Sequence, residues 1–189
     1  MNKYIVLILS ILAVFYTLWF TSFGSLTENS GALSKTGLAH PVLFIIWGIL
    51  VFTALYWGII TLYRKLLPKN KVYIILTVLA LLGMILTLSC RFDYSVKAEY
   101  YLHCAGSLTF SVATGVCIFL LYLLNSKKGA FYSVICTAVG VILIADLVLL
   151  LIFQESALVE AVPVVFGLII IPITVFKVNA KKEKIYASR

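Results

Sequence analysis

The chain has 189 residues, of which 63% are hydrophobic and only 12% are charged. Soluble domains contain about 25% charged residues, so this composition excludes a soluble fold and leaves no room for a soluble catalytic domain. The formal net charge is +8, but the basic residues lie mostly in short polar segments, where they set membrane orientation rather than bind nucleic acid.

Six apolar segments are long enough to cross a membrane as a helix, which needs about 20 residues. They lie at 4–23, 41–62, 72–90, 102–124, 131–153 and 158–176. The alternation of polar and apolar residues that is typical of a transmembrane β-barrel is absent from them. The sequence therefore predicts an all-α membrane protein, with one domain over residues 1–189 that is a bundle of six transmembrane helices.

The basic residues are divided unequally between the two sides of this predicted bundle. Twelve of the 15 lie on the side of the two termini: Lys3, Arg64, Lys65, Lys69, Lys71, Lys127, Lys128, Lys177, Lys181, Lys182, Lys184 and Arg189. The other side has Lys35, Arg91 and Lys97. Because short cytoplasmic loops are enriched in Lys and Arg, both termini are predicted to be cytoplasmic. Five of the seven acids then lie at the outer side: Glu28, Asp93, Glu99, Glu155 and Glu160.

The first outer segment and the third and fourth spans carry further signals. Segment 24–40 is rich in Ser, Thr and Gly, which predicts an irregular loop with a short surface helix that caps the outer mouth of the bundle. Small residues one turn apart let two membrane helices approach closely, so we expect the third and fourth spans to pack tightly. These residues are Gly83, Thr87, Ser107, Ser111 and Gly115.

Asp146 is an ionisable residue inside the fifth predicted span, where it needs a partner, a proton or water. Its neighbours on the same helical face are apolar, so a partner must come from another helix. The candidates at a similar depth are His103, Arg91, Ser107 and Thr87. An aspartate in this position is typical of a proton-coupling or substrate site, and also of a hydrogen-bonded residue that holds a bundle together.

Glu99, His103 and Ser107 follow one another at a spacing of four residues, so they share one face of the fourth predicted helix. His103 in this setting is a candidate to accept a proton or to bind a lipid head group, and a structural histidine is the alternative. The sequence has no nucleophile elbow and no Cys or His pattern at metal spacing. We therefore assign no catalytic residue, metal or cofactor.

Cys90 and Cys104 lie near the outer ends of the third and fourth spans. An oxidising exterior would permit a disulfide between them, and two unpaired cysteines are the alternative.

A polar first outer loop, an FD…LH segment around the fourth span (Asp93, His103) and an acid at the start of the sixth (Glu160) accompany the six spans. In these features the chain resembles the DRAM/Frag-like six-helix membrane proteins and their bacterial relatives, although Ala161 stands where an arginine usually follows the acid. The eukaryotic members are associated with lipid-anchor remodelling and autophagy, and the bacterial members have no settled activity. The resemblance implies a lipid-facing role, and we expect a bacterial plasma membrane.

Three functions are compatible with these residues. The first is the binding or sensing of a lipid or small amphiphile in an outer-leaflet pocket, which requires Asp146, Glu99 and His103 to converge. The second is a small proton-coupled transporter or exporter, and the third is an intramembrane hydrolase. The partners we expect are membrane lipids and a lipid or small-molecule ligand, without nucleic acid. The candidate ligand-binding or proton-coupling residues are Asp146, His103, Glu99, Arg91, Asp93, Ser107 and Glu160.

Overall fold

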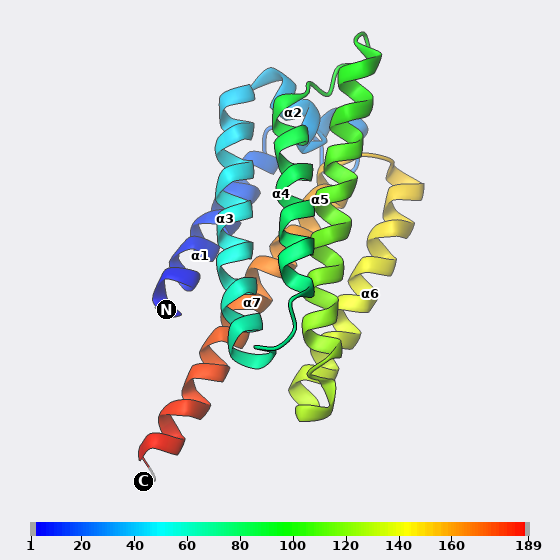
Figure 1. Cartoon of the computed structure of the whole chain (residues 1–189). Helices are drawn as coiled ribbons and strands as arrows, with labels where there is room; N and C mark the ends of the chain where they lie inside the picture. Colours follow the sequence, from blue (N-terminus) through cyan, green and yellow to red (C-terminus); the bar gives the residue numbers. More distant parts are fainter. Residues whose placement is uncertain (1–2, 188–189) are drawn as a thin grey trace.

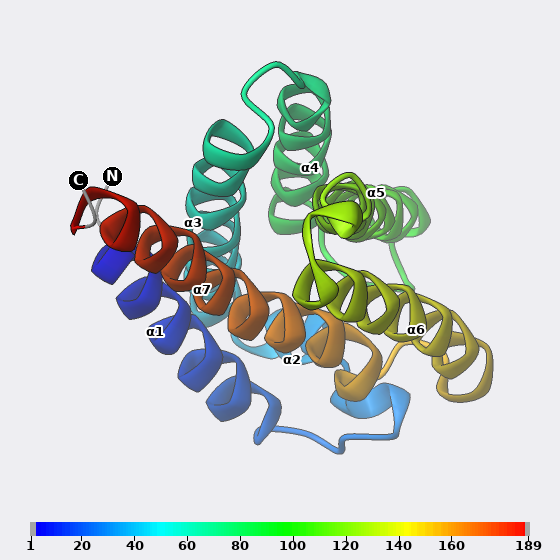
Figure 2. The same cartoon turned by 90° about the horizontal axis from the view of Figure 1, so that it is seen from below.

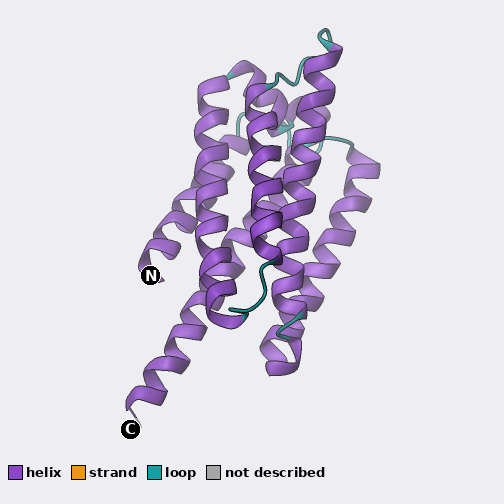
Figure 3. Cartoon of the chain, in the orientation of Figure 1, coloured by secondary structure: helices purple, strands orange, loops and turns teal. Residues whose placement is uncertain are grey.

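The computed structural model describes residues 3–187, apart from the side chains of Phe153 and of residues 181–187. Within this range the chain forms helices joined by short loops, with no strand (Figure 3). Arg189 and the side chains of Lys181, Lys182 and Lys184, which were counted above as cytoplasmic, lie outside the described part.

Six helices in the described part are long and apolar enough to cross a membrane. They are α1 (Lys3–Thr21), α3 (Pro41–Leu66), α4 (Val72–Ser89), α5 (Lys97–Leu123), α6 (Ala130–Phe153) and α7 (Ala157–Ala187). The prediction of an all-α protein with six long apolar helices is therefore confirmed.

Three of these helices extend beyond the apolar segments that mark them in the sequence. Helix α5 begins at Lys97 rather than 102, α3 ends at Leu66 rather than 62, and α7 ends at Ala187 rather than 176. The added turns are polar, as in Arg64 and Lys65 at the end of α3. Hydropathy detects only the residues that suit hydrocarbon, whereas the helical hydrogen bonds continue into the polar interface.

The loop that precedes α3 contains a short 3₁₀ turn, η1 (Asn29–Gly31), and the helix α2 (Leu33–Ala39). Figure 1 shows α2 at the end of the bundle away from the C-terminus. The short helix was expected on the surface, but its first turn is buried, with Leu33 and Ser34 almost inaccessible to solvent. Leu33 brings an apolar side chain into the core, so burial of this side chain explains why α2 enters the bundle.

Helices α4 and α5 form the most closely packed pair, as expected for the third and fourth spans. The contact is made by Gly83 and Gly106, and a Cβ atom added to either would lie 2.7 Å from the carbonyl oxygen of the other. Only glycine permits such an approach of two backbones. Among the residues expected to form this contact, Gly115 instead faces Leu143 of α6.

Buried tyrosines connect α5 to its other neighbours. Tyr63 of α3 donates a hydrogen bond to the carbonyl oxygen of Cys117 over 2.8 Å, and Tyr122 of α5 lies 2.7 Å from the hydroxyl of Thr174 on α7. Hydrogen bonds between helices replace water as the partner of such groups in a membrane. They fix α3, α5 and α7 as one unit.

Helix α6 lies at the edge of this unit, beside α5 and the first turns of α7 (Figure 2). Only 11% of the residues in its most apolar stretch are buried inside the protein. The side chains of Ile144 and Leu151 are more than 60% exposed. The helix ends at Phe153 and is followed by Gln154, whose φ of 53° is uncommon for a residue other than glycine. The next residue, Glu155, lines a cavity described below.

Candidate functional site

A cavity of about 290 Å³ lies between α2, α3, α4, α5, α6 and α7. Its polar lining consists of Ser34, Thr87, His103, Cys104, Ser107, Ser111, Asp146, Glu155 and Glu160. Its apolar lining consists of Leu33, Phe44, Trp47, Met84, Phe92, Leu108, Phe110, Leu150, Val159, Pro163 and Val164. The cavity therefore has the mixed character of a small-molecule site, in which a few polar groups converge on an apolar pocket.

The cavity reaches the outer surface of the bundle between α5 and α6. Leu108 and Leu150 line it, and both are also exposed on the outside of the helices, to 61% and 37%. Further along the bundle, Gly115 packs against Leu143 and Gly140 against Phe119, so α5 and α6 are in contact there. A molecule dissolved in the surrounding lipid would meet the opening laterally.

His103 is buried on the cavity wall, with 2% of its surface exposed. Its Nδ1 atom lies 2.9 Å from the carbonyl oxygen of Cys90 at the end of α4. Its Nε2 atom lies 3.0 Å from the hydroxyl of Ser34 on α2. Since a carbonyl oxygen only accepts hydrogen bonds, Nδ1 carries a proton, whereas Nε2 can either donate to the Ser34 hydroxyl or accept from it.

Glu160 of α7 contacts the same serine from the other side. The Ser34 hydroxyl lies 2.7 Å from Oε1 of Glu160, and the Ser34 backbone N–H donates to Oε2 over 3.2 Å. The N–H of Leu33 also donates to this carboxyl group. Glu160 thus satisfies N–H groups in the first turn of α2, which have no partner inside the helix, and it fixes α2 against α7.

Asp146 lies on the α6 side of the cavity and also lines a smaller adjoining space of about 70 Å³ between α5, α6 and α7. Its Oδ1 atom is buried and makes no hydrogen bond with any described residue. Burying a carboxyl oxygen without a partner inside a membrane costs on the order of several kcal/mol. This atom is therefore available to a ligand.

Glu155 lines the cavity from the α6–α7 turn and takes part in a second group of polar contacts. Asn29 donates to its carbonyl oxygen over 2.9 Å and to its carboxyl group over 3.2 Å. Tyr100 donates to the other carboxyl oxygen over 3.4 Å, while Lys35 donates to Asn29. These contacts hold the loop before α2 against the α6–α7 turn.

The residues singled out from the sequence fall into two groups. Asp146, His103, Ser107 and Glu160 line the cavity. Glu99, Arg91 and Asp93 do not line it, because Arg91 and Asp93 lie in the α4–α5 loop and Glu99 lies in the first turn of α5. There Glu99 accepts a hydrogen bond from the Arg91 backbone over 3.3 Å. The convergence of Glu99 with Asp146 and His103 that we expected is therefore not found.

Asp93 has a structural role in the α4–α5 loop. Its carboxyl group accepts hydrogen bonds from the backbone and hydroxyl of Ser95, over 2.9 and 2.7 Å. These bonds, and to a lesser extent the nearby Arg91, hold the pKa of Asp93 below its usual value. The contact closes a local turn rather than forming part of a site.

Cys90 and Cys104 are free thiols, as are Cys117 and Cys136. Of the two alternatives for Cys90 and Cys104, the structure has the unpaired one. Cys90 contributes its backbone to the His103 contact, and Cys104 lines the cavity.

Sequence reasoning missed two polar residues of the site, Ser34 and Glu155. Ser34 contacts Glu160 across 126 positions in the chain, and its segment has no apolar periodicity that would place it in the core. Glu155 was assigned only to the outer side. Only an indirect feature of the sequence pointed to Ser34. His103 and Glu160 each needed a hydrogen-bond partner, and the nearest polar segment in the predicted topology was 24–40, which contains Ser34.

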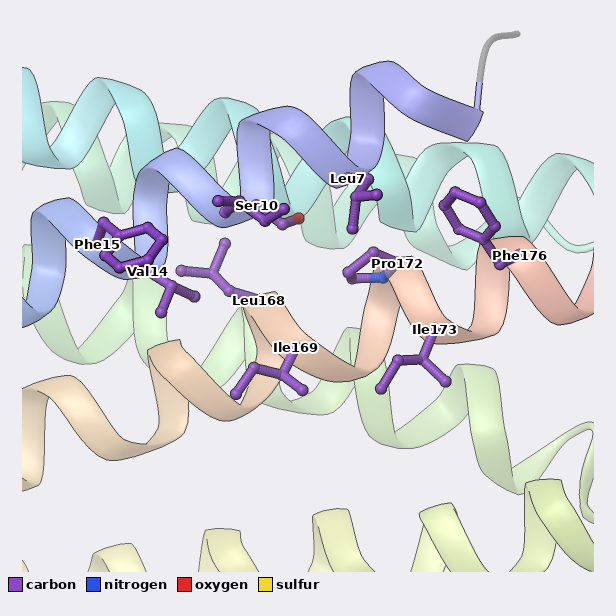
Figure 4. A pocket seen from close by; sticks show the side chains of 10 residues that line it. Leu7, Ser10, Val14, Phe15, Leu168, Ile169, Pro172, Ile173 and Phe176 are labelled. Carbon is purple, nitrogen blue, oxygen red and sulfur yellow. The ribbon is translucent and has the colours of Figure 1, made fainter.

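A second hollow lies on the opposite side of α7, where it packs against α1 (Figure 4). It has a volume of about 540 Å³ and is lined by α1 residues Leu7, Ser10, Ile11, Val14 and Phe15 and by α7 residues Leu168, Ile169, Pro172, Ile173 and Phe176. Among the described residues of this lining, Ser10 has the only polar side chain. The described residues of this groove include no charged side chain that would distinguish one polar ligand group from another.

The Ser34, His103 and Glu160 contacts resemble the parts of a hydrolase but not their arrangement. In a catalytic triad the acid orients the histidine, and backbone N–H groups beside the serine receive the oxyanion. Here the acid contacts the serine itself, and its carboxyl group takes up the N–H groups of Leu33 and Ser34. A negative charge developing on a substrate at Ser34 would therefore face Glu160.

No protein-family model, curated protein or solved structure matches this chain. The resemblance to the DRAM/Frag-like proteins accordingly stays a prediction.

Proposed function

We propose that this protein binds a small amphiphile in the cavity of about 290 Å³ between α2, α3, α4, α5, α6 and α7. The observation that supports this proposal most is that one cavity combines buried polar groups with an apolar wall and reaches the lipid-facing surface beside Leu108 and Leu150. A molecule with a polar end and an apolar body matches both parts. It would enter from the lipid between α5 and α6.

The polar end of this amphiphile donates hydrogen bonds or carries positive charge. Asp146, Glu155 and Glu160 contribute carboxyl groups to the described lining, which contains no Lys or Arg. The apolar body lies along Trp47, Phe110 and their neighbours. A long-chain amine is the simplest molecule of this kind, because an ammonium group has three donors and no acceptor.

We place the cavity in the outer leaflet of a plasma membrane. The support for this orientation is the unequal division of Lys and Arg, because the loops at the cavity end contain only three of the 15. A ligand would then come from the outer leaflet or leave toward it.

A second candidate function is proton-coupled transport of the same amphiphile. The specific observation in its favour is the Asp146 carboxyl oxygen that is buried without a hydrogen-bond partner among the described residues. A carboxyl group that exchanges a proton for a cationic ligand couples the two movements. Binding alone requires no such exchange.

Trp47 provides the test of binding, since it lines the cavity, whereas Trp19 and Trp57 are 47% and 41% exposed on the outside. In a variant with Trp19→Phe and Trp57→Phe, dodecylamine added to the protein in lipid nanodiscs should change Trp47 fluorescence along a saturable curve. Asp146→Asn should weaken this binding at least tenfold. The matched control is Glu28→Gln, an exposed acid at the same end of the molecule, which should leave it unchanged.

A linear, unsaturable change, or equal affinities in the Asp146→Asn and Glu28→Gln variants, would contradict the proposed site. Transport is tested separately in proteoliposomes. There a pH gradient should drive faster uptake of dodecylamine by vesicles that contain the wild-type protein than by vesicles that contain the Asp146→Asn variant. Binding without any protein-dependent uptake would leave binding as the function and exclude the second candidate.

A further inference from the structure

His103, Ser34 and Glu160 form one continuous chain of hydrogen bonds that begins at a backbone carbonyl. The steps are 2.9 Å from Cys90 O to Nδ1, 3.0 Å from Nε2 to the Ser34 hydroxyl, and 2.7 Å from that hydroxyl to Oε1 of Glu160. All three side chains lie on the wall of the cavity. The chain joins α5 to α7 through a residue of α2.

The number of protons in this chain follows from the donors and acceptors. Nδ1–H is fixed by the Cys90 carbonyl, so two hydrogen bonds remain, one on each side of the Ser34 oxygen. Each needs one proton, and the serine hydroxyl supplies only one of them. The second must be held by either Nε2 of His103 or the carboxyl group of Glu160.

Two forms satisfy both hydrogen bonds. In the charged form, protonated Nε2 donates to the Ser34 oxygen, and the hydroxyl donates to an ionised Glu160. In the neutral form, a protonated Glu160 donates to the Ser34 oxygen, and the hydroxyl donates to Nε2. Removing the extra proton altogether leaves two lone pairs facing each other in a buried site, which loses a hydrogen bond.

We propose that His103, Ser34 and Glu160 are a proton relay, which holds a single proton between imidazole and carboxyl group and moves it through the Ser34 hydroxyl. In one step the N–H bond at Nε2 breaks as an O–H bond forms at Ser34, and the original hydroxyl proton passes to Oε1 of Glu160. The reverse step restores the charged form. No atom is gained or lost, and no other reactant takes part.

The other titratable groups that face the relay are Glu155 from the α6–α7 turn, Asp146 from α6 and Cys104 from α5. In the described lining, α3 and α4 contribute Phe44, Trp47, Met84 and Thr87, none of which titrates. The cavity therefore exposes the relay to other acids but to no Lys or Arg. The relay does not depend on the proposed ligand, although it would give proton-coupled transport a second proton-holding group beside Asp146.

The test measures the two ends of the relay in the same sample. The sequence has only two histidines, so a His40→Gln background leaves the two ring ¹⁵N signals of His103, which together report its charge and tautomer in lipid bilayers. Infrared spectra of the same protein, compared with its Glu160→Gln variant, give the ionised fraction of Glu160. Between about pH 5 and 8, where histidine ordinarily titrates, the imidazolium fraction should equal the ionised fraction of Glu160.

A neutral His103 beside an ionised Glu160 at one pH would overturn the relay, whether or not dodecylamine binds. Glu160→Gln is the sharper variant, because the Ser34 backbone N–H keeps the amide oxygen as its acceptor, so the amide NH2 group faces the Ser34 oxygen and donates to it. The serine hydroxyl must then donate its hydrogen bond to an unprotonated Nε2. His103 should then be neutral with its proton on Nδ1 at every pH in this range, and imidazolium in this variant would contradict the proposal. Ser34→Ala should uncouple the two ends, and Ser34→Thr, which keeps the hydroxyl, should restore the coupling.

Discussion

Helices α5 and α6 are consecutive in the chain, yet the bundle holds them very differently. Helix α5 is in backbone contact with α4 through Gly83 and Gly106 and receives buried tyrosine hydrogen bonds from α3. Helix α6 is mostly exposed and carries an Asp146 oxygen without a hydrogen bond in the described structure. Tight packing fixes His103, whereas the loosely held helix borders the opening of the cavity. Helix α5 thus carries residues that stabilise the fold, whereas α6 carries the residue that we propose binds the ligand.

The largest effect is expected where the α4–α5 contact is broken. In Gly106→Ala the new Cβ would lie 2.7 Å from the carbonyl oxygen of Gly83 and the N–H of Thr87. Because two backbones must separate, the free energy of unfolding should fall by about 3 kcal/mol, the upper part of the range for overpacking. Gly140→Ala in α6 is the matched control, since its Cβ would meet only Phe119 at 3.5 Å. Unfolding in mixed detergent micelles measures both, and equal effects would contradict the comparison.

Asp146→Leu should act in the opposite direction. Since the buried Oδ1 atom of Asp146 has no hydrogen-bond partner among the described residues, removing it should raise the free energy of unfolding by about 1–2 kcal/mol. The same variant should lose dodecylamine binding in the Trp47 assay. A fall in stability would show instead that Asp146 holds the bundle together.

A smaller effect is expected for the tyrosines. Tyr63→Phe removes the hydrogen bond to Cys117 and should lower the free energy of unfolding by about 0.6 kcal/mol, the average for such bonds in a membrane. The control is Tyr132→Phe in α6, whose hydroxyl makes no hydrogen bond within the described residues. Denaturation curves for the two variants should differ, with only Tyr63→Phe shifted.

The smallest effect concerns the loop that joins α4 and α5. Ser95→Ala removes the hydrogen bond from the serine hydroxyl to Asp93, so the pKa of Asp93 should rise toward its usual value. Folding lowers the pKa of Asp93, so its ionised carboxyl group stabilises the folded state at pH values above the pKa of the unfolded chain. This stabilisation is lost as the pH falls through the pKa of the folded state. An NMR titration of ¹³C-labelled aspartate measures the shift, and the overall stability at neutral pH should hardly change because Asp93 is at the surface.

The sequence contained most of the fold because lipid imposes a strong condition on each span. Twenty apolar residues in a row have few alternatives to a membrane helix, so six helices could be predicted with errors only at their polar ends. The contact at Gly83 could be anticipated because small residues let two membrane helices approach closely. Its partner Gly106 was not, because a single glycine in a helix does not indicate which face meets another helix.

The site was only partly predictable. An acid or histidine inside a span needs a partner, which pointed to Asp146 and His103. The helical spacing that added Glu99 placed it on the correct face but one turn too far along α5, where it contacts Arg91. Ser34 could not be found in this way, since its contact with Glu160 depends on α2 entering the core.

The central claim is that the cavity beside α6, and not the groove between α1 and α7, binds the amphiphile. A long-chain amine with a photoreactive group at the end of its chain, irradiated with the protein in nanodiscs and mapped by mass spectrometry, tests it most directly. We expect labelling at Leu108, Phe110 and Val164, with competition by dodecylamine and loss in Asp146→Asn. Labelling confined to Ile11, Phe15 and Ile169, or equal labelling of both hollows without competition, would contradict the account.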